Sequence, residues 1–259
     1  MSRDQAKIVW VTGASSGLGR SMALQLARQG TRVIASARNR QALEALAGES
    51  TGIEPLACDI TDATQLAELG ERIGAITPRL DRAILNAGNC EYLDFPDPDW
   101  GAIRRVMEVN FHGTVNCVEL ALPLLRASEM ARPHLVMVAS QVTAAPFPRA
   151  EAYGASKAAL QYFSDSLRID LAAEHIDVSV VNPGFVDTPL TRKNDFDMPF
   201  LMDVDDAARR ILSRLDSRPR HYSFPKRLSA LLLLSKLAPS LWQKMVAADN
   251  RSSTHPTEN

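Results

Sequence analysis

Continuous apolar segments alternate with longer helical patterns along most of this sequence, and this alternation constrains the fold more than any other feature. Apolar segments without a polar residue at every second position are typical of strands buried on both faces of a sheet. They cover residues 7–11, 32–36, 53–58, 82–86, 134–140 and 177–182. Strands separated by helices form parallel sheets with right-handed crossovers. The pattern therefore predicts an α/β fold built on one parallel sheet.

The length of the chain agrees with one domain of this class. Its 259 residues contain no internal repeat and no linker-like segment, so we expect a single domain over residues 1–250. Within it we predict a C-terminal helical segment at about 203–247. The polar stretch 251–259 is expected to form a disordered tail.

Charge and cysteine content narrow the class of protein. The formal net charge of −1 gives no sign of a nucleic-acid partner. Cys58, Cys90 and Cys117 form neither a C-x-x-C pair nor a metal-ligand spacing. We therefore expect no metal site, and reduced thiols in a cytoplasmic protein. The first apolar run ends at Thr12, so we expect no secretory signal.

The segment 224–246 is apolar, carries spaced lysines and is interrupted by Pro239. Its longest uninterrupted apolar run, 230–234, is too short to span a bilayer. We expect the segment to pack on the core or on a neighbouring subunit. Peripheral contact with a membrane, as an interfacial amphipathic helix, stays open as the alternative.

The stretch "VTGASSGLGR" at 11–20 fits two kinds of site, because it lies between a predicted strand and a predicted helix. Gly13 to Gly17 has the spacing of a hydrolase nucleophile elbow, with Ser15 as the nucleophile. Glycines at 13, 17 and 19 also suit a phosphate-binding turn. An elbow serine needs a later histidine, and only His221 fits by chain order. The nucleotide interpretation is therefore favoured.

The residues after the second predicted strand bear on coenzyme choice. NAD sites place an acid about twenty residues beyond the glycine loop to hold the ribose 2′-hydroxyl. Here position 37 is Ala and Arg38 follows, with no Asp or Glu anywhere from Gln5 to Leu43. An arginine suits a 2′-phosphate, which a carboxylate would repel. The sequence predicts NADP(H) rather than NAD(H).

Tyr153 and Lys157 lie four residues apart at the start of a helical pattern, which places them on one face of the helix. A free tyrosine has a pKa of roughly 10. A cation about 4 Å away would stabilise its phenolate by about 4 kcal/mol at an effective dielectric constant of about 20. We therefore expect Lys157, helped by an oxidised nicotinamide, to lower the pKa of Tyr153 so that it can act as a general acid or base.

Two polar residues accompany this pair. Ser140 ends a predicted strand, where α/β proteins build their sites, and its hydroxyl could orient a reacting oxygen. Asn110 lies in an apolar helical pattern with Val106 and Thr114. A buried asparagine needs hydrogen-bond partners, so either a structural role or the holding of a water fits Asn110.

Together these motifs resemble the short-chain dehydrogenase/reductase family. The matching pieces, in family order, are "TGASSGLG" (12–19), "CDI" (58–60), "NAG" (86–88), Asn110, Ser140, "YGASK" (153–157) and "NPGFVDT" (182–188). The resemblance covers about residues 6 to 190. It implies a doubly wound, Rossmann-like sheet with strand order 3-2-1-4-5-6-7. It also implies a homodimer or homotetramer in which the helices carrying Asn110 and Tyr153 pair with a second subunit.

The resemblance also implies cofactor contacts. Ser15, Gly17 and Leu18 line the pyrophosphate side, and Asp59 and Ile60 face the adenine. Thr12 and Asn86 to Gly88 stabilise the sheet edge and the cleft. Tyr153 and Lys157 also hold the nicotinamide ribose, and Val186 and Thr188 dock the carboxamide. Ser16 stands where some NADP-preferring members place a basic residue, so the coenzyme prediction depends on Arg38. The predicted cofactor residues are Thr12, Gly13, Ser15, Ser16, Gly17, Leu18, Gly19, Arg38, Asp59, Ile60, Asn86, Ala87, Gly88, Tyr153, Lys157, Pro183, Val186 and Thr188.

The catalytic tetrad that the resemblance implies is Asn110, Ser140, Tyr153 and Lys157, with Asn110 anchoring a water. The predicted function is NADP(H)-dependent interconversion of a carbonyl and a secondary alcohol. Segments 141–151 and 189–202 should flank the nicotinamide end, and their apolar residues hint at a lipophilic substrate: Phe147, Phe196, Met198, Phe200 and Met202. A serine hydrolase using Ser15 and a nucleotide-sensing module without turnover are the alternatives.

Overall fold

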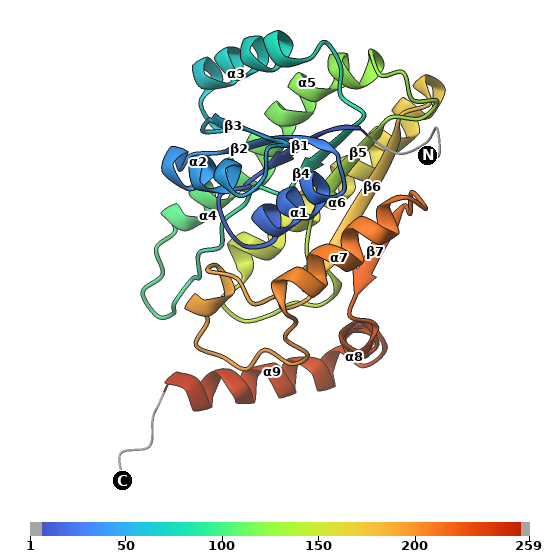
Figure 1. The fold of residues 1–259 in the computed structure, drawn as a ribbon. Coiled ribbons are helices and arrows are strands. Elements are labelled where there is room, and N and C mark those ends of the chain that lie inside the picture. The colour runs from blue at the N-terminus through green and yellow to red at the C-terminus, as the bar shows by residue number, and fades with distance from the viewer. Residues whose placement is uncertain (1–6, 255–259) are drawn as a thin grey trace.

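The computed structural model describes residues 7–254, which form a single domain around one seven-stranded sheet (Figure 1). All pairings are parallel and the order is β3-β2-β1-β4-β5-β6-β7, so the doubly wound, Rossmann-like prediction is confirmed. The order reverses between β1 and β4, where folds of this kind bind ligands. The strands are β1 (Ile8–Thr12), β2 (Arg32–Ala37), β3 (Ile53–Ala57), β4 (Arg82–Leu85), β5 (His134–Val138), β6 (Asp177–Pro183) and β7 (His221–Phe224).

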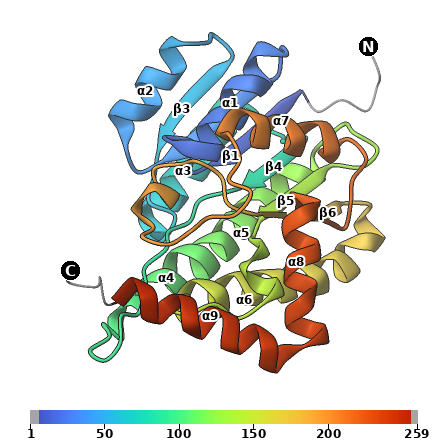
Figure 2. The same cartoon turned by 90° about the horizontal axis from the view of Figure 1, so that it is seen from below.

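Helices cover both faces of the sheet, as Figures 1 and 2 show from two directions. Asn39 and Asp62 accept hydrogen bonds from first-turn N–H groups of the helices after β2 and β3, which fixes where those loops end. The α-helices are α1 (Gly17–Arg28), α2 (Arg40–Gly48), α3 (Ala63–Ile76), α4 (Gly101–Met107), α5 (Gly113–Arg126), α6 (Glu151–Asp170), α7 (Val204–Leu215), α8 (Lys226–Leu237) and α9 (Pro239–Thr254). Short helical turns are η1 (Glu108–His112), η2 (Gln141–Ala144), η3 (Leu171–Glu174) and η4 (Thr191–Lys193).

The core consists of two apolar layers, one on each face of the sheet. Successive side chains of a strand point to opposite faces. On β1, Val9 and Val11 pack with α1, α2 and α7, whereas Trp10 packs with α3, α5 and α6. Strands buried on both faces need apolar residues at every position. This is why the continuous apolar runs of the sequence located six strands to within about two residues.

The predicted C-terminal helical segment, 203–247, is wrong in one part, because β7 interrupts it. The run "HYSF" is too short and too polar to stand out as a buried strand. It nevertheless pairs with β6 from Val180↔His221 to Pro183↔Phe224, and Phe224 is buried. Tertiary pairing, rather than local pattern, makes this segment a strand.

Two further differences from the sequence predictions concern helix geometry. Asn110 lies in a π-helical turn, η1, between α4 and α5, where a regular helical pattern was expected. Such single turns are rare and often occur at functional sites. The tail predicted from residue 251 begins inside α9, which continues to Thr254 because no glycine or proline interrupts residues 240–254. Residues 255–259 lie outside the described part of the chain.

Candidate active site

The turn between β1 and α1 is tight because glycines let its backbone pack against itself. Gly13 has a φ of +67°, and a Cβ at this position would lie 2.8 Å from Ala87 Cα. A Cβ on Gly19 would lie 2.3 Å from the carbonyl oxygen of Gly13. Both distances are below any normal contact, so a side chain at either position would push the loop out of place. The glycines thus hold the loop close to the start of α1.

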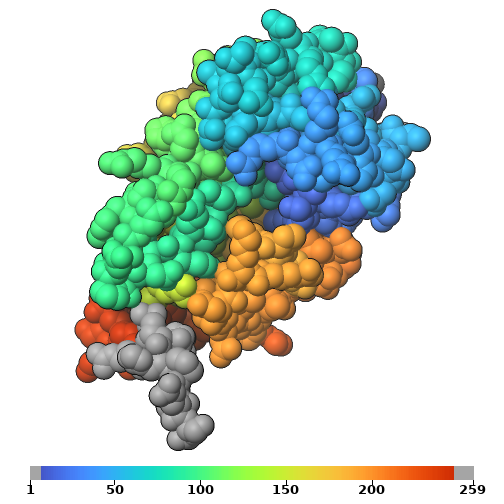
Figure 3. Space-filling view, turned by 90° about the vertical axis from the view of Figure 1, so that its left-hand side faces the viewer, coloured from blue at the N-terminus to red at the C-terminus, as the bar shows by residue number. Residues whose placement is uncertain are grey.

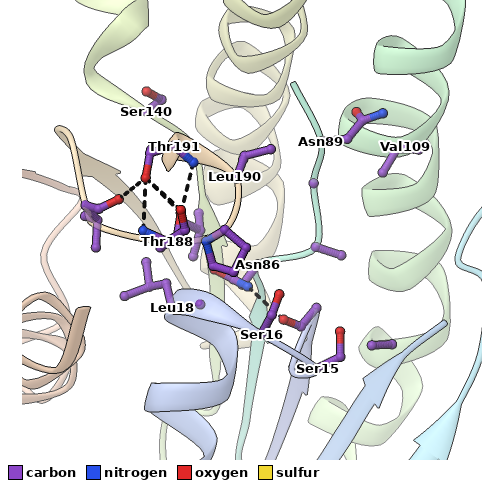
Figure 4. A pocket seen from close by; sticks show the side chains of 18 of the residues that line it. Ser15, Ser16, Leu18, Asn86, Asn89, Val109, Ser140, Thr188, Leu190 and Thr191 are labelled. Carbon is purple, nitrogen blue, oxygen red and sulfur yellow. Dashed lines mark hydrogen bonds between the residues drawn. The ribbon is translucent and has the colours of Figure 1, made fainter. Parts of the chain in front are cut away.

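The N-terminus of α1 opens into the cleft beside this loop. Ser16 is the N-cap residue, but its side chain makes no capping hydrogen bond, and the first turn contains no acidic residue. Free N–H groups at a helix start attract anions. Figure 4 shows Ser15 and Ser16 on one side of the cleft and Leu190 and Thr191 on the other. This end of the cleft therefore suits a pyrophosphate.

The carboxyl ends of β1 and β4 are joined by side-chain hydrogen bonds. The Thr12 hydroxyl accepts from the backbone N–H groups of Asn86 and Ala87, each at 3.0 Å. The Asn86 amide in turn donates to the Thr12 carbonyl at 3.2 Å. Both strands end at the point where the sheet order reverses, so these bonds fix the floor of the cleft.

The far end of the cleft, beyond β2 and β3, carries Arg38 and Asp59. The Arg38 guanidinium lies 3.9 Å from an Asp59 carboxylate oxygen, and the arginine side chain is 73% exposed. The other Asp59 oxygen accepts from Thr61 N and Thr61 Oγ1. Arg38 is therefore held only loosely and is available to an incoming anion.

Ser140, Tyr153 and Lys157 converge where β5 ends beside α6. Lys157 is buried and its Nζ donates to the Val138 carbonyl at 2.9 Å. The same Nζ lies 5.8 Å from the centre of the Tyr153 ring. Ser140 forms a hydrogen bond with the Tyr153 side chain, which by itself lowers the pKa of that phenol. The predicted helix face thus brings the pair together beside the serine.

The pKa of Tyr153 is raised in this structure, so the lowering expected from the sequence is wrong. Burial raises the pKa of Tyr153 to about 12, with a smaller contribution from Cys90, and outweighs the bond from Ser140. Burial also lowers the pKa of Lys157 to about 8. The lysine charge is directed at the Val138 carbonyl instead of the phenol oxygen, which explains why it does not offset desolvation. Tyr153 is consequently protonated at neutral pH.

Asn110 is fully buried and fully bonded. Its Oδ1 accepts from Asn89 N at 2.8 Å, and its Nδ2 donates to Asn89 O and to Ser156 Oγ, each at 2.9 Å. Gly88 lies against it, since a Cβ there would be 3.0 Å from Asn110 Oδ1 and 3.3 Å from Lys157 Nζ. These side-chain bonds tie η1 to α6 and to the loop after β4, which supports a structural role for Asn110; the water-holding role stays a prediction.

Two cavities meet at the Ser140–Tyr153 pair. One is a cleft of about 540 Å³ that contains the glycine loop and Arg38, and the other is a pocket of about 720 Å³ that Tyr153 also lines. In Figure 3 the surface is hollowed between the green segment around α4 and the orange segment before α7. The residues that line both cavities are Ser140, Tyr153, Gly184, Leu190 and Thr191.

The cleft contains nearly every residue predicted to touch the cofactor. The exceptions are Thr12 and Gly19, which do not line the cleft. The predicted catalytic residue Asn110 does not line it either. Sequence reasoning did not single out several lining residues at or just after strand ends, or in η1, where position in the fold was the only signal. These are Ala37, Asn39, Asn89, Val109, Val138 and Ala139. Further lining residues, not named one by one, lie in motifs or segments already expected at the cofactor: Cys58, Gly184, Pro189, Leu190 and Thr191.

The second pocket has an apolar wall that the sequence predicted only in part. Phe147 and Phe196 line it, but Met198, Phe200 and Met202 do not. Met202 instead forms a bridge with Val186 and packs on the core, and Phe200 is partly exposed. Six wall residues come from the C-terminal helices, which the sequence analysis had assigned to the core or a subunit contact: Leu228, Leu231, Leu232, Trp242, Met245 and Val246.

Polar side chains around this pocket are bonded to one another. Arg149 forms ion pairs with Asp94 and Asp195. The Tyr92 hydroxyl donates to Asn194 Oδ1 at 2.5 Å. One cation faces two carboxylates, so this cluster is acidic overall and offers no free cation to an anionic substrate.

The hydrolase alternative finds no partner for Ser15. Among the described residues, no histidine lines the cleft that contains Ser15. His221, the partner expected from chain order, lies on β7 and bonds to Asp165 at 2.8 Å. A Ser–His relay at Ser15 therefore has no support in this geometry.

Comparison with known proteins decides the family. The family model described as short chain dehydrogenase matches residues 7–198. The chain belongs to the short-chain dehydrogenase family. It is 36% identical over 244 residues to an uncharacterized oxidoreductase of Myxococcus xanthus, covering 93% of this chain and 96% of that protein.

Solved structures agree on the fold of this short-chain dehydrogenase. A short chain dehydrogenase from Burkholderia cenocepacia in complex with NADP has a TM-score of 0.81 at 24% identity, covering 95% of this chain and 99% of that one. A 3-ketoacyl-(acyl-carrier-protein) reductase from Brucella melitensis complexed with NADH has a TM-score of 0.76 at 24% identity, covering 86% of this chain and 97% of that one. The protein is thus an oxidoreductase of a family that uses nicotinamide cofactors and acts on small molecules.

Proposed function

We propose that this short-chain dehydrogenase reduces a lipophilic ketone or aldehyde with NADPH. The observation that carries the proposal is the position of Ser140 and Tyr153, which line both the cleft and the apolar pocket. A carbonyl held in the pocket would meet a cofactor held in the cleft where the two cavities join, beside this pair. A nucleotide sensor without turnover would not need a proton donor at that junction.

The cleft fits a nicotinamide dinucleotide. The glycine loop and the α1 N-terminus would hold the pyrophosphate, Ile60 and Asp59 would face the adenine, and Lys157 would hold the nicotinamide ribose. Pro183 at the end of β6, with Val186 and Thr188 beyond it, would contact the carboxamide end. When bound in reduced form, this group would supply the hydride.

Arg38 supports NADPH over NADH. Its exposed guanidinium lines the cleft, and Asp59 is the acid nearest to it and already accepts two bonds from Thr61. An arginine at this position favours a 2′-phosphate. One solved neighbour holds NADP and the other NADH, so the preference of this chain depends on its own residues.

Tyr153 is the proposed proton donor and Ser140 its companion. The raised pKa of Tyr153, about 12, keeps the phenol protonated at neutral pH, which suits donation to a carbonyl oxygen. The Ser140 hydroxyl would donate a second hydrogen bond to that oxygen. Lys157, whose pKa falls to about 8, is largely charged at neutral pH. Its Nζ would turn from the Val138 carbonyl toward the Tyr153 ring, 5.8 Å away, and stabilise the phenolate left behind. A protonated Tyr153 and a charged Lys157 at neutral pH favour carbonyl reduction over alcohol oxidation.

A lipophilic substrate is supported by the pocket wall. Phe147, Phe185, Phe196 and Trp242 surround it, and the charges at Arg149 are already paired. Large apolar pockets with few polar groups bind apolar ligands by burying their surface.

We also propose that the protein is a cytoplasmic homo-oligomer. The α6 helix exposes Tyr162 and Ile169, which supports pairing of the helices that carry Asn110 and Tyr153. The cysteines Cys58, Cys90 and Cys117 are free, which supports a reducing compartment. A solution mass that shows only monomer at micromolar concentration would contradict the oligomer.

The proposed function is tested with the full chain, NADPH or NADH, and a series of ketones and aldehydes of increasing chain length. Absorbance at ~340 nm reports reduction, and a parallel ester assay reports hydrolysis. We expect NADPH oxidation whose kcat/KM rises with chain length. Ser15→Ala should stay within a few-fold of wild type, because the loop acts through backbone N–H groups. Ester hydrolysis that vanishes in Ser15→Ala would establish the hydrolase instead.

A further inference from the structure

The outer sides of α8 and α9 expose large apolar residues that the fold does not use. Their inner sides pack on the body of the protein through Leu228, Leu232 and Trp242. On α8, Leu233, Leu234 and Leu237 are exposed, and Leu237 is 74% exposed. On α9, Leu241 and Met245 are exposed in the same way, four residues apart. In Figure 2 the two helices lie in front of the rest of the molecule and run in different directions.

The charged residues of α8 and of α9 as far as residue 248 are all basic. From residue 217 to residue 248 the sequence has no Asp or Glu. Lys226, Arg227, Lys236 and Lys244 are all exposed. Positions 226 and 233, like 227 and 234, are seven apart on α8, which places the basic residues on the side of the exposed leucines. Apolar residues bordered by lysine and arginine are typical of helices that lie in the interface of an anionic membrane.

This surface is continuous with the substrate pocket. Met245 is 48% exposed and also lines the pocket. Leu231 and Leu232 line the pocket from the inner side of α8, directly before the exposed Leu233 and Leu234. An apolar molecule leaving a lipid surface at α9 would therefore move along apolar side chains from the outer side of the helices into the pocket.

Packing on the core, the arrangement favoured from the sequence, accounts for the inner sides of these helices but not for the outer ones. Among the described residues, no helix is long and apolar enough to cross a membrane. A second copy of the chain would cover the leucines but would bring eight like charges together. Positive charge on an apolar surface fits an anionic lipid better.

We propose that the outer sides of α8 and α9 form a membrane-docking surface for anionic lipid, defined by Leu233, Leu234, Leu237, Leu241 and Met245 with the four basic residues. The helices lie in the interface, and the apolar substrate enters the pocket past Met245. The docking surface stands on its own observations, whereas the entry route depends on the proposed function.

The test is sedimentation of the full chain with phosphatidylcholine vesicles, with and without phosphatidylglycerol, at low and high ionic strength. We expect wild type to pellet with the anionic vesicles and to be released in part by salt. Each basic residue near such a surface strengthens binding about fivefold. Lys236→Gln with Lys244→Gln should therefore weaken binding about 25-fold.

Leu237→Glu and Leu201→Glu form a matched pair, because both wild-type residues are exposed leucines, 74% and 46% exposed, and Leu201 lies outside α6, α8 and α9 and lines neither cavity. Leu237→Glu should weaken vesicle binding at least about fivefold, and Leu201→Glu should leave it unchanged. Wild type that fails to pellet, or equal effects of the two substitutions, would overturn the docking surface. Loss of an oligomer in Leu237→Glu, without vesicle binding by wild type, would assign the surface to a second copy.

Turnover separates the two proposals. Leu237 does not line either cavity, so Leu237→Glu should reduce a short, water-soluble carbonyl at the wild-type rate. With a long-chain carbonyl presented in anionic vesicles, its rate should fall in proportion to lost binding. Vesicle binding without any turnover would leave the docking surface intact and reject the proposed function. An unchanged rate on vesicle-borne substrate would reject the entry route.

Discussion

Replacing Arg38 by Gln should change which coenzyme the enzyme uses. Arg38 lies in the cleft at the end remote from Tyr153, so its guanidinium would contact a 2′-phosphate and no reacting atom. Its partner Asp59 lies 3.9 Å away, a distance at which little stabilisation is lost when the arginine turns to a phosphate. The substitution therefore isolates the contact that distinguishes NADPH from NADH.

The size of the effect follows from the exposure of the side chain. A hydrogen bond to a charged group contributes about 1.5–3 kcal/mol. Because Arg38 is 73% exposed, solvent screening keeps the contact near the low end of that range. A loss of about 1.5–2 kcal/mol corresponds to roughly a tenfold to thirtyfold fall in the NADPH to NADH ratio of kcat/KM.

The assay compares kcat/KM for both coenzymes with one saturating carbonyl substrate. Arg40→Gln is the matched control, since Arg40 is exposed one residue beyond Asn39 but does not line the cleft. We expect the ratio to fall in Arg38→Gln through NADPH alone, and to stay at the wild-type value in Arg40→Gln. Equal ratios in wild type and Arg38→Gln would refute the argument, as would a wild type that already prefers NADH.

Three other perturbations test separate parts of the structure. Gly19→Ala puts a Cβ 2.3 Å from the Gly13 carbonyl oxygen. The KM for the coenzyme should therefore rise at least about tenfold, and the melting temperature should fall. An NADPH affinity equal to that of wild type, measured by titration, would show that the loop can move aside. Trp242→Ala removes a buried ring that donates a hydrogen bond to the Pro146 carbonyl and packs edge-to-face on Phe147. The free energy of unfolding, measured with denaturant, should fall by about 3 kcal/mol, and the KM for long substrates should rise. An unaltered free energy of unfolding would mean that Trp242 does not anchor α9. The rate of carbonyl reduction should be constant below about pH 7 and decline as pH rises through about 8, because the pKa of Lys157 is lowered to about 8 and a neutral lysine no longer stabilises the phenolate. Lys157→Met should lack this decline. A wild-type pH profile without the decline would contradict the role of Lys157.

The sequence located the sheet and most of the cleft because both depend on local patterns. Strands buried on two faces must be apolar throughout, and the turn after β1 must be glycine where the backbone meets itself, as at Gly13 and Gly19. Tyr153 and Lys157 share a helix face by their spacing alone. These features can be predicted without knowledge of distant contacts.

The remaining features depend on contacts between distant residues. β7 exists because β6 pairs with it, and the pocket wall formed by Trp242 depends on where α9 folds back. The π-turn at Asn110 accompanies bonds to Asn89 and Ser156, which come from other segments. The pKa of Tyr153 was predicted in the wrong direction because burial and the Lys157–Val138 bond are properties of the folded chain.

The central claim, that Tyr153 donates the proton in an NADPH-dependent reduction, is tested most directly by Tyr153→Phe. The ring stays in place, so the variant should fold and bind NADPH with an affinity close to that of wild type, measured by fluorescence titration. Turnover of the best carbonyl substrate should fall about 10²–10⁴-fold, the usual contribution of general acid catalysis. Turnover near the wild-type rate, with NADPH binding intact, would contradict the mechanism.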